Sequence, residues 1–327
     1  MNTSFQTIQD TLSSAKRVAL FGHERPDGDS IGSVLGLYHL LTSNTSAKVT
    51  PHTLDDVPEN LAFLPWFDLV EREYTEGEYD LLVILDTANA ERCWLTTEQL
   101  SATRTLVIDH HQSNEGYGDQ NWIDPHASSV AEMLTTFAQE LGWEMPADAA
   151  ECLLTGIYTD TGGFIHRNTS QYSFEQAALL VAKGADNQLI AEKVFKSNSF
   201  EFQKDLGTLL SRMTMYTDVN FCSMYGYEEA AGKDLKTVLV SMLNSIEWVR
   251  YACVLTQDGE NVRGSLRTNR NDVNVSDMAA VYGGWGHTKA SGFYFPGQLV
   301  RTEEGEDYIE KDGEKMSVEE FLKTLEK

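Results

Sequence analysis

The sequence predicts an α/β protein whose N-terminal domain has a mainly parallel sheet flanked by helices, followed by a smaller α+β C-terminal domain. The first observation is a series of short apolar or β-branched runs separated by helical or turn-rich stretches, which is typical of a buried parallel sheet. The second is a change to strand and hairpin patterns beyond about residue 215. The third is the length of 327 residues, enough for two domains of ordinary size.

The N-terminal strands are predicted at residues 17–22, 47–53, 79–86 and 104–109. Covering helices are predicted over residues 30–41 and 128–141, because their apolar residues recur at helical spacing. From residue 145 to about 213 the pattern is mainly helical, with Gly184 as a helix stop and a bridging helix over residues 200–213.

Beyond this helix, residues 215–225 have the composition of one strand. Residues 251–255 and 262–268 flank Asp258-Gly259, a dipeptide typical of hairpin turns. The acidic residues 303–320 are expected to form a solvated edge and a terminal helix. We therefore divide the chain into a domain over residues 1–199, a linker helix over 200–214 and a domain over 215–327.

Composition narrows the classes of function. With 41% hydrophobic residues the chain can build a substantial core, which excludes disorder as its main state. The formal net charge of -25 argues against a non-specific nucleic-acid coat protein or a binder of anionic membranes. Long duplex nucleic acid is therefore not an expected partner.

The cysteines and the apolar segments indicate where the protein works. Cys93, Cys152, Cys222 and Cys253 lie far apart with no C-x-x-C pair, so we interpret them as packed thiols of a reducing compartment. No window approaches the roughly 18 to 20 apolar residues that span a bilayer. The expected location is the cytoplasm, with no membrane partner.

Chemistry-bearing residues follow the predicted strands directly. They are His23, Asp27 and Asp29 after the first strand, Asp86 after the third, and Asp109, His110 and His111 after the fourth. Ligands bind at the carboxyl ends of strands in an open α/β sheet, where these side chains can converge. Each has a structural alternative: Asp27 as a helix cap, Asp86 as a turn residue, either histidine as a core residue. Their joint placement, with Asp160 in a further polar turn, favours a functional site.

So many carboxylates cannot share one site unless cations neutralise them, because nearby like charges raise each other's pKa. Two imidazoles with four aspartates and no thiolate fit Mn²⁺ best, with Mg²⁺, Co²⁺ or Fe²⁺ as alternatives. Six ligands shared by two ions leave positions for water and a phosphate oxygen. We therefore predict two Mn²⁺ ions in an open hydrolase site.

These motifs also carry a family resemblance. Residues 23–29, Leu85-Asp86, Asp109-His110-His111 and Asp160-Thr161-Gly162 resemble the four ordered motifs of the DHH phosphoesterase superfamily. Residues 283–287 and 290–292 resemble the glycine-rich signature of the DHH-associated C-terminal domain. The match covers about residues 17–295, and the two-domain layout is most similar to the nanoRNase and pAp-phosphatase branch, the bifunctional oligoribonucleases.

The resemblance implies two metal sites that share Asp86 as a bridging ligand. One consists of His23, Asp27 and Asp86, the other of Asp29, Asp86, His110 and Asp160. His111 would face the phosphate, and Asp109 would orient neighbouring groups. A turn at Gly28 would let the two aspartates that flank it address adjacent ions.

The C-terminal half is expected to hold the substrate. Residues 235–301 contain seven basic and five acidic residues, a locally basic zone in an acidic chain. The resemblance makes Arg267 a clamp for the distal phosphate, and the glycine loop would offer backbone N–H groups to an oxyanion. The predicted substrate-binding residues are Arg267, Gly283, Gly284, Trp285, Gly286, His287 and Ser291.

Two positions depart from the family pattern. Trp285 replaces a glycine of the loop, and it either stacks on a base or packs internally. The arginine that the family has after its fourth motif is missing from residues 164–166, and Arg167 either replaces it from a shifted register or leaves the contact unmade.

The resulting expectation is a cytoplasmic, Mn²⁺-dependent phosphodiesterase that hydrolyses short oligoribonucleotides to mononucleotides in the cleft between two domains, with pAp phosphatase activity as a further expectation. Short RNA or nucleotides are the expected partners, and a homodimer stays an open alternative. Rival functions are a linear or cyclic dinucleotide phosphodiesterase, an inorganic pyrophosphatase and a non-catalytic nucleotide-binding protein.

Overall fold

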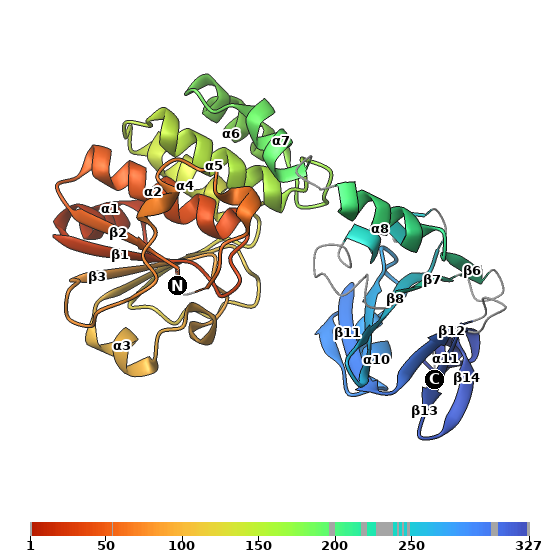
Figure 1. The fold of residues 1–327 in the computed structure, drawn as a ribbon. Helices are drawn as coiled ribbons and strands as arrows, with labels where there is room; N and C mark the ends of the chain where they lie inside the picture. The colour runs from red at the N-terminus through yellow and green to blue at the C-terminus, as the bar shows by residue number, and fades with distance from the viewer. Residues whose placement is uncertain are drawn as a thin grey trace. The chain divides into compact units, whose positions relative to one another are not determined.

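The computed structural model of the chain describes residues 2–53, 55–195, 200–216, 221–226, 238–240, 242–243, 245–246, 249–301 and 307–325. The chain divides into two compact units, Met1–Ser197 and Asn198–Lys327 (Figure 1).

The N-terminal unit is built on a parallel sheet whose described strands lie in the order β2-β1-β3-β4-β5. The strands are β1 (Arg17–Phe21), β2 (Lys48–His52), β3 (Leu81–Leu85), β4 (Thr105–Asp109) and β5 (Gln120–Ile123). The first four confirm the predicted strands to within about two residues. β5 was not predicted because Trp122 is the one buried residue among its four, so the sequence lacks an apolar run there.

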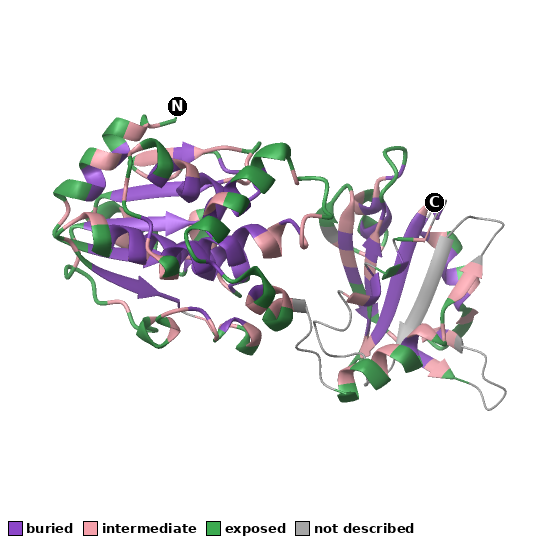
Figure 2. Cartoon of the chain, turned by 90° about the horizontal axis from the view of Figure 1, so that it is seen from above, coloured by how far each residue is buried: buried purple, intermediate pink, exposed green. Residues whose placement is uncertain are grey.

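Helices cover both faces of this sheet, as predicted. Val18 and Leu20 of β1 join the core beneath α1 (Phe5–Ser14), α2 (Gly28–Asn44), α4 (Val130–Glu140) and α5 (Ala147–Asp160). Ala19 and Phe21 belong to a second core on the opposite face, beneath the short helix η3 (Ala90–Cys93) and α3 (Thr97–Ala102). Because successive side chains of a strand point to opposite faces, both sides of the strands are buried (Figures 1 and 2).

Close packing of α2 against α5 brings the first turn of α2 next to the last turn of α5. A Cβ at Gly32 would lie 2.5 Å from the Cys152 carbonyl oxygen, and one at Gly36 would meet the Leu153 side chain at the same distance. The two glycines therefore permit a backbone approach that larger residues would prevent. After α5 come α6 (Gln171–Ala182) and α7 (Asn187–Phe195), separated at the predicted helix stop, Gly184, whose φ is 112°.

The described part of the C-terminal unit contains a mixed sheet in the order β10-β11-β9-β8-β7-β6 and a smaller sheet, β12-β13-β14. The strands are β6 (Thr214–Tyr216), β7 (Phe221–Gly226), β8 (Tyr251–Asp258), β9 (Asn261–Arg267), β10 (Trp285–His287), β11 (Ala290–Pro296), β12 (Gln298–Arg301), β13 (Asp307–Lys311) and β14 (Glu314–Ser317). The hairpin of β8 and β9 confirms the Asp258-Gly259 turn.

Two predicted elements of this unit need correction. The single strand predicted over residues 215–225 is wrong, since β6 and β7 are separate strands that pair antiparallel with Met215 opposite Cys222. The prediction merged them because both strands are rich in apolar and aromatic residues. The helix predicted over residues 200–213 ends earlier, as α8 (Phe200–Leu210), and its Leu209 packs in one cluster with Ala252 and Val254 of β8. The terminal helix is present as α11 (Val318–Thr324).

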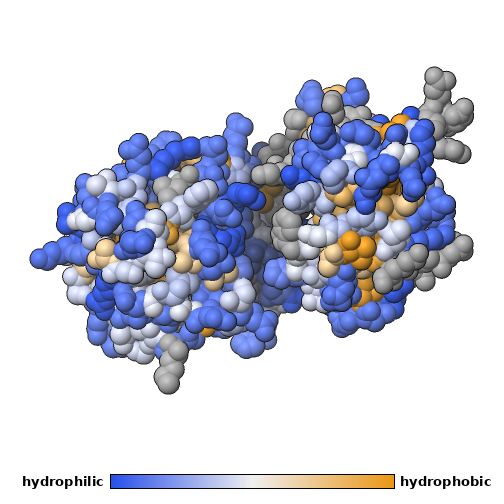
Figure 3. Space-filling view, turned by 90° about the horizontal axis from the view of Figure 1, so that it is seen from below, coloured by the Kyte–Doolittle hydropathy of each residue, from blue (hydrophilic) through white to orange (hydrophobic). Residues whose placement is uncertain are grey.

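The surface and the cysteines agree with the composition. Cys93, Cys152 and Cys253 are buried free thiols, as expected, whereas the Cys222 side chain lies outside the described residues. On the face drawn in Figure 3, hydrophilic residues cover most of the N-terminal unit. Among the helices that the structure describes, none combines the length and the apolar character needed to cross a membrane.

Candidate metal centre

Acidic and histidine side chains gather where β1, β3 and β4 end, next to the first turn of α2 and the last turn of α5. Asp86, which follows β3, has a φ of 53°, in the left-handed region that few residues other than glycine adopt. This sharp turn brings the carboxylate, only 2% exposed, to a central position in the cluster. The rest of the site is arranged around its two oxygens.

One group of side chains faces Oδ2 of Asp86. His23 Nε2 lies 3.4 Å from this oxygen and 3.6 Å from Asp27 Oδ2. The other ring nitrogen, Nδ1, is 2.6 Å from the Glu24 carbonyl oxygen. This contact assigns the proton to Nδ1 and leaves Nε2 available as a ligand atom.

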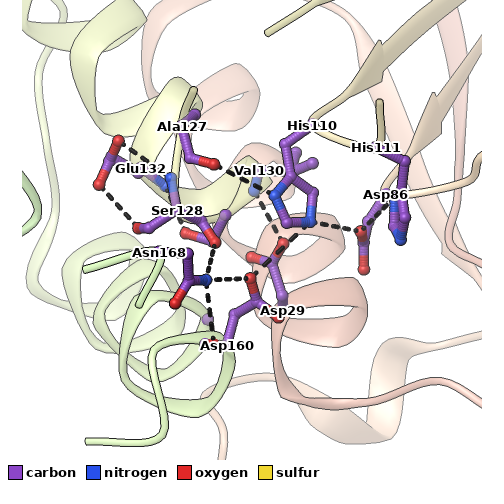
Figure 4. Close-up of polar contacts among 12 residues, drawn as sticks. Asp29, Asp86, His110, His111, Ala127, Ser128, Val130, Glu132, Asp160 and Asn168 are labelled. Atoms are coloured by element: carbon purple, nitrogen blue, oxygen red, sulfur yellow. Dashed lines mark hydrogen bonds and ion pairs between the residues drawn. The ribbon is translucent and has the colours of Figure 1, made fainter. Parts of the chain in front are cut away.

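A second group faces Oδ1 of Asp86, which is 3.5 Å from His110 Nε2 (Figure 4). The same His110 nitrogen lies 3.8 Å from Asp160 Oδ2, and its Nδ1 is 3.3 Å from the Ala127 carbonyl oxygen. The potential ligand atoms of His23, Asp27 and Asp86 lie within 4.8 Å of one another, as do those of Asp86, His110 and His111. Asp86 therefore belongs to both groups.

Asp27 is a helix cap, as in its structural alternative, and its carboxylate also faces the cluster. Its Oδ1 caps α2 by accepting hydrogen bonds from the N–H groups of Asp29 and Ser30, each at 3.0 Å, while its Oδ2 faces His23. The role expected for Gly28 needs correction, because this residue is the first of the helix rather than the centre of a turn. A Cβ there would lie 2.4 Å from the Thr159 side chain, so Gly28 permits close approach to α5.

Asp29 is held by the beginning of α4. Its carboxylate accepts hydrogen bonds from the N–H groups of Val130 at 2.8 Å and Ala131 at 3.0 Å, and from the Ser33 hydroxyl at 3.2 Å. The positive end of the helix dipole favours a carboxylate here. Asp29 is only 1% exposed, so its position is fixed before any ligand binds.

Behind His111, Asp109 and Asn114 form a buried chain of hydrogen bonds. His111 Nδ1 donates to Asp109 Oδ1 at 2.8 Å, and Asn114 Nδ2 donates to Asp109 Oδ2 at 2.7 Å. Burial opposes ionisation of Asp109, but the contacts with His111 and the Asn114 hydrogen bond together outweigh it and lower the pKa of the carboxyl. Sequence reasoning missed Asn114, although its place three residues after the histidine pair was a signal.

The charges of the cluster test whether a cation fits. Burial, followed by repulsion from Asp86 and Asp160, raises the pKa of Asp29 well above its ordinary range. Burial and the negative charges of Asp86 and Asp27 outweigh the attraction of His110 and raise the pKa of Asp160 to about 6. The cluster thus carries more negative charge than its own groups compensate.

The pKa values of the two central histidines also reflect the excess negative charge of the cluster. Burial opposes the imidazolium form of His23, but contacts with Asp27 and Asp86 outweigh it and raise the pKa of His23 to about 10. The pKa of His110 is likewise about 10, because Asp86 and Asp29 outweigh burial. Without a metal ion, protons on the two histidines therefore balance part of the carboxylate charge. A hard or borderline divalent ion suits the same set of oxygen and imidazole donors.

Among the predicted substrate residues, Arg267 differs from its charged neighbours. Its Nη1 donates to the Leu266 carbonyl oxygen at 2.9 Å, and no carboxylate of the described residues pairs with it. By contrast, Arg263 pairs with Asp258 at 2.6 Å, and Arg270 pairs with Asp272 at 2.8 Å. The basic zone is therefore partly neutralised from within.

The glycine loop follows α10 (Val275–Ala280). The N–H of Gly283 donates to the Ala280 carbonyl at 2.9 Å, and that of Gly284 donates to the Ala279 carbonyl at 3.0 Å. This corrects the expectation that these two amides are free to bind an oxyanion. They instead end the helix, where Gly283 adopts a φ of 68°.

The other loop residues follow in a hairpin. Gly286 pairs with Ser291, whose hydroxyl donates to the His287 carbonyl at 2.8 Å. His287 is exposed, as is Arg167 in the N-terminal unit. The side chain of Trp285 lies outside the described residues, so neither of its two alternatives is decided.

The parallel sheet and the two groups of side chains that share Asp86 define a candidate metal site of the hydrolase type. A family model described as "DHH family, N-terminal domain" matches residues 17–157. A bifunctional oligoribonuclease and PAP phosphatase NrnA from Bacillus subtilis is 30% identical over 298 residues, which cover 86% of this chain and 90% of that protein.

Two further proteins are similar to this chain over most of its length. The protein of the same name from Thermus thermophilus is 30% identical over 277 residues, covering 83% of this chain and 81% of that one. The crystal structure of an exopolyphosphatase-related protein from Bacteroides fragilis superimposes with a TM-score of 0.84 at 27% identity, covering 98% of this chain and 95% of that one. The chain belongs to the DHH phosphoesterase family, which confirms the predicted resemblance and fold class.

Proposed function

We propose that this protein is a metal-dependent phosphodiesterase that hydrolyses short oligoribonucleotides to mononucleotides and also removes phosphate from pAp. The observation that carries the proposal is the position of Asp86, whose two oxygens face two separate histidines at 3.4 and 3.5 Å. Two relatives named bifunctional oligoribonuclease and PAP phosphatase match this chain over most of their length, which supports the substrate class.

The residues around Asp86 would hold the ions. We assign one Mn²⁺ to His23, Asp27 and Asp86, and the other to Asp29, Asp86, His110 and Asp160. Such ions, when bound, lower the pKa of water and neutralise phosphate charge. Deprotonated His23 and His110 are required for this role, and their Nδ1 hydrogen bonds to backbone carbonyls keep Nε2 directed at the cluster.

His111 is our candidate for contact with the phosphate. Its Nδ1 already donates to the buried carboxylate of Asp109, so Nε2 is the nitrogen available to the substrate. In its protonated form the ring would donate Nε2–H to a phosphate oxygen. The Asp109 contact holds the ring in a fixed orientation for this role.

Arg267 is our candidate for a phosphate further along the substrate. Its side chain lacks a carboxylate partner among the described residues, unlike Arg263 and Arg270. A guanidinium binds phosphate through paired, charge-assisted hydrogen bonds. One such contact in a chain with a net charge of -25 suits a short substrate better than a long polyanion.

A substrate panel tests the proposal. The purified protein would be given RNA dinucleotides to pentanucleotides, pAp, cyclic dinucleotides and pyrophosphate, each with Mn²⁺ or Mg²⁺. We expect mononucleotides from the short RNAs and phosphate from pAp, with Mn²⁺ the better ion. Preferential cleavage of cyclic dinucleotides or pyrophosphate would replace the proposed substrate class, and binding without turnover would indicate a nucleotide-binding protein.

A further inference from the structure

The end of the connection from β5 to α4, together with the first two residues of α4, contacts the candidate ligands of the second ion. Within residues 127–131, the Ala127 carbonyl is the partner of His110 Nδ1, and the N–H groups of Val130 and Ala131 bind Asp29. Figure 4 shows these contacts converging on one side of the cluster. We call residues 127–131 the anchor turn.

Asn168 connects Asp160 to the same turn. Its Nδ2 donates to the Ser128 carbonyl at 3.0 Å and lies 3.2 Å from the carbonyl oxygen and 3.3 Å from Oδ2 of Asp160. The amide has two hydrogens, so it can serve the turn with one and Asp160 with the other. In this way a residue 40 positions away in sequence links the anchor turn to the end of α5 (Figure 4).

Buried side chains hold the anchor turn rigidly. Glu132, only 3% exposed, accepts hydrogen bonds from the Ser128 N–H at 3.2 Å and the Ser128 hydroxyl at 2.7 Å. The Ser129 hydroxyl caps α4 by accepting from the Glu132 N–H at 3.1 Å. Because buried polar groups that are fully paired move little, the carbonyl of Ser128 is a fixed point for Asn168.

We propose that Asn168 is a positioning residue that orients the Asp160 carboxylate for the second ion by tying it to the anchor turn. The inference rests on the proposed metal centre. The Asp160 side chain is 29% exposed and shares the cluster with other carboxylates, which repel it. The neutral amide of Asn168 holds one carboxylate oxygen of Asp160 without competing for the ion. Through its contacts with His110, Asp29 and Asn168, the anchor turn then fixes the positions of the three candidate ligands relative to one another.

Metal titration of metal-free protein by isothermal calorimetry tests this role. Asn168→Leu keeps a similar size and removes both N–H donors, and Asn168→Ala removes the amide altogether. We expect two Mn²⁺ binding steps in the unaltered protein and a loss of about 10- to 100-fold in the affinity of one step in either variant, as for other groups that orient metal ligands.

A matched control is Asn44→Leu. Asn44 also bridges two carbonyls, those of Leu40 at 2.9 Å and Glu144 at 2.8 Å, but it lies at the opposite end of α2 from the cluster. We expect its loss to lower the melting temperature and leave both Mn²⁺ affinities unchanged. Asn168 variants that behave in the same way would overturn the proposal in favour of a purely structural link.

A double-mutant cycle separates positioning from general damage. If Asn168 acts through Asp160, Asn168→Leu should cost no further Mn²⁺ affinity once Asp160→Ala is present. Additive losses would overturn the inference. Absence of Mn²⁺ binding to the unaltered protein would instead refute the proposed metal centre, so the two failures are distinguishable.

Discussion

His111 Nδ1 lies 2.8 Å from Oδ1 of Asp109, a carboxylate with no solvent exposure. The contact fixes the orientation of the ring. Asp109→Asn should therefore lower kcat by about 100-fold, since a wrong ring orientation or tautomer impairs a positioned histidine. Metal analysis should still find the same number of ions per chain.

A matched control for this change lies at the other end of β4. Asp119 accepts a hydrogen bond from the Thr105 N–H at 2.9 Å, where the strand begins. Asp119→Asn should leave kcat within about twofold. Equal losses in both variants would show that Asp109 supports only the sheet.

The raised histidine pKa values predict how the stability of the metal-free protein depends on pH. His23 and His110 have a pKa of about 10 in the folded chain and about 6.5 when unfolded. Between these values the folded state holds more protons, so its stability falls as pH rises. The melting temperature of the metal-free protein should decrease from pH 7 to pH 10.

Manganese should reverse this trend, because it binds the neutral imidazoles and replaces the protons. We expect saturating Mn²⁺ to raise the melting temperature, more strongly at pH 9 than at pH 7, and to release protons that a pH-stat measures. A melting temperature that is constant with pH and with Mn²⁺ would be inconsistent with a preformed cluster.

Loss of Arg267 should affect an RNA dinucleotide and a small phosphodiester differently. Loss of a charge-assisted phosphate contact costs roughly 1.5 to 3 kcal/mol, or about 10- to 150-fold in kcat/KM. Arg267→Ala should show this loss on an RNA dinucleotide and little loss on bis-p-nitrophenyl phosphate. Arg263→Ala, on the same strand but paired with Asp258, is the control and should retain both activities. Equal losses on both substrates would assign Arg267 to the fold or the metal site.

The sequence predicted the first four strands and the cluster for one physical reason. Strands buried on both faces are continuous apolar runs, so their ends are visible, and the polar residues placed there must share an edge of the sheet. Asp86 and His110 could be predicted in this way. β5 could not, because one buried residue, Trp122, leaves no periodic signal.

Two sets of contacts made through backbone groups were not predictable. The link from Asn168 to the Ser128 carbonyl spans 40 residues and depends on how α5 ends beside α4. The N–H groups of Gly283 and Gly284 were expected to be free because glycine loops often expose them. Their use at the end of α10 depends on local dihedral angles that residue types alone do not determine.

The most direct test of the account is Asp86→Ala, measured for bound Mn²⁺ and for dinucleotide hydrolysis on the same samples. Both ligand groups include Asp86, so its loss should weaken both ions at once while leaving the circular dichroism spectrum unchanged. The account predicts fewer than two ions per chain and no measurable turnover at Mn²⁺ concentrations that saturate the unaltered protein. Two bound ions with activity within tenfold of the unaltered protein would contradict it.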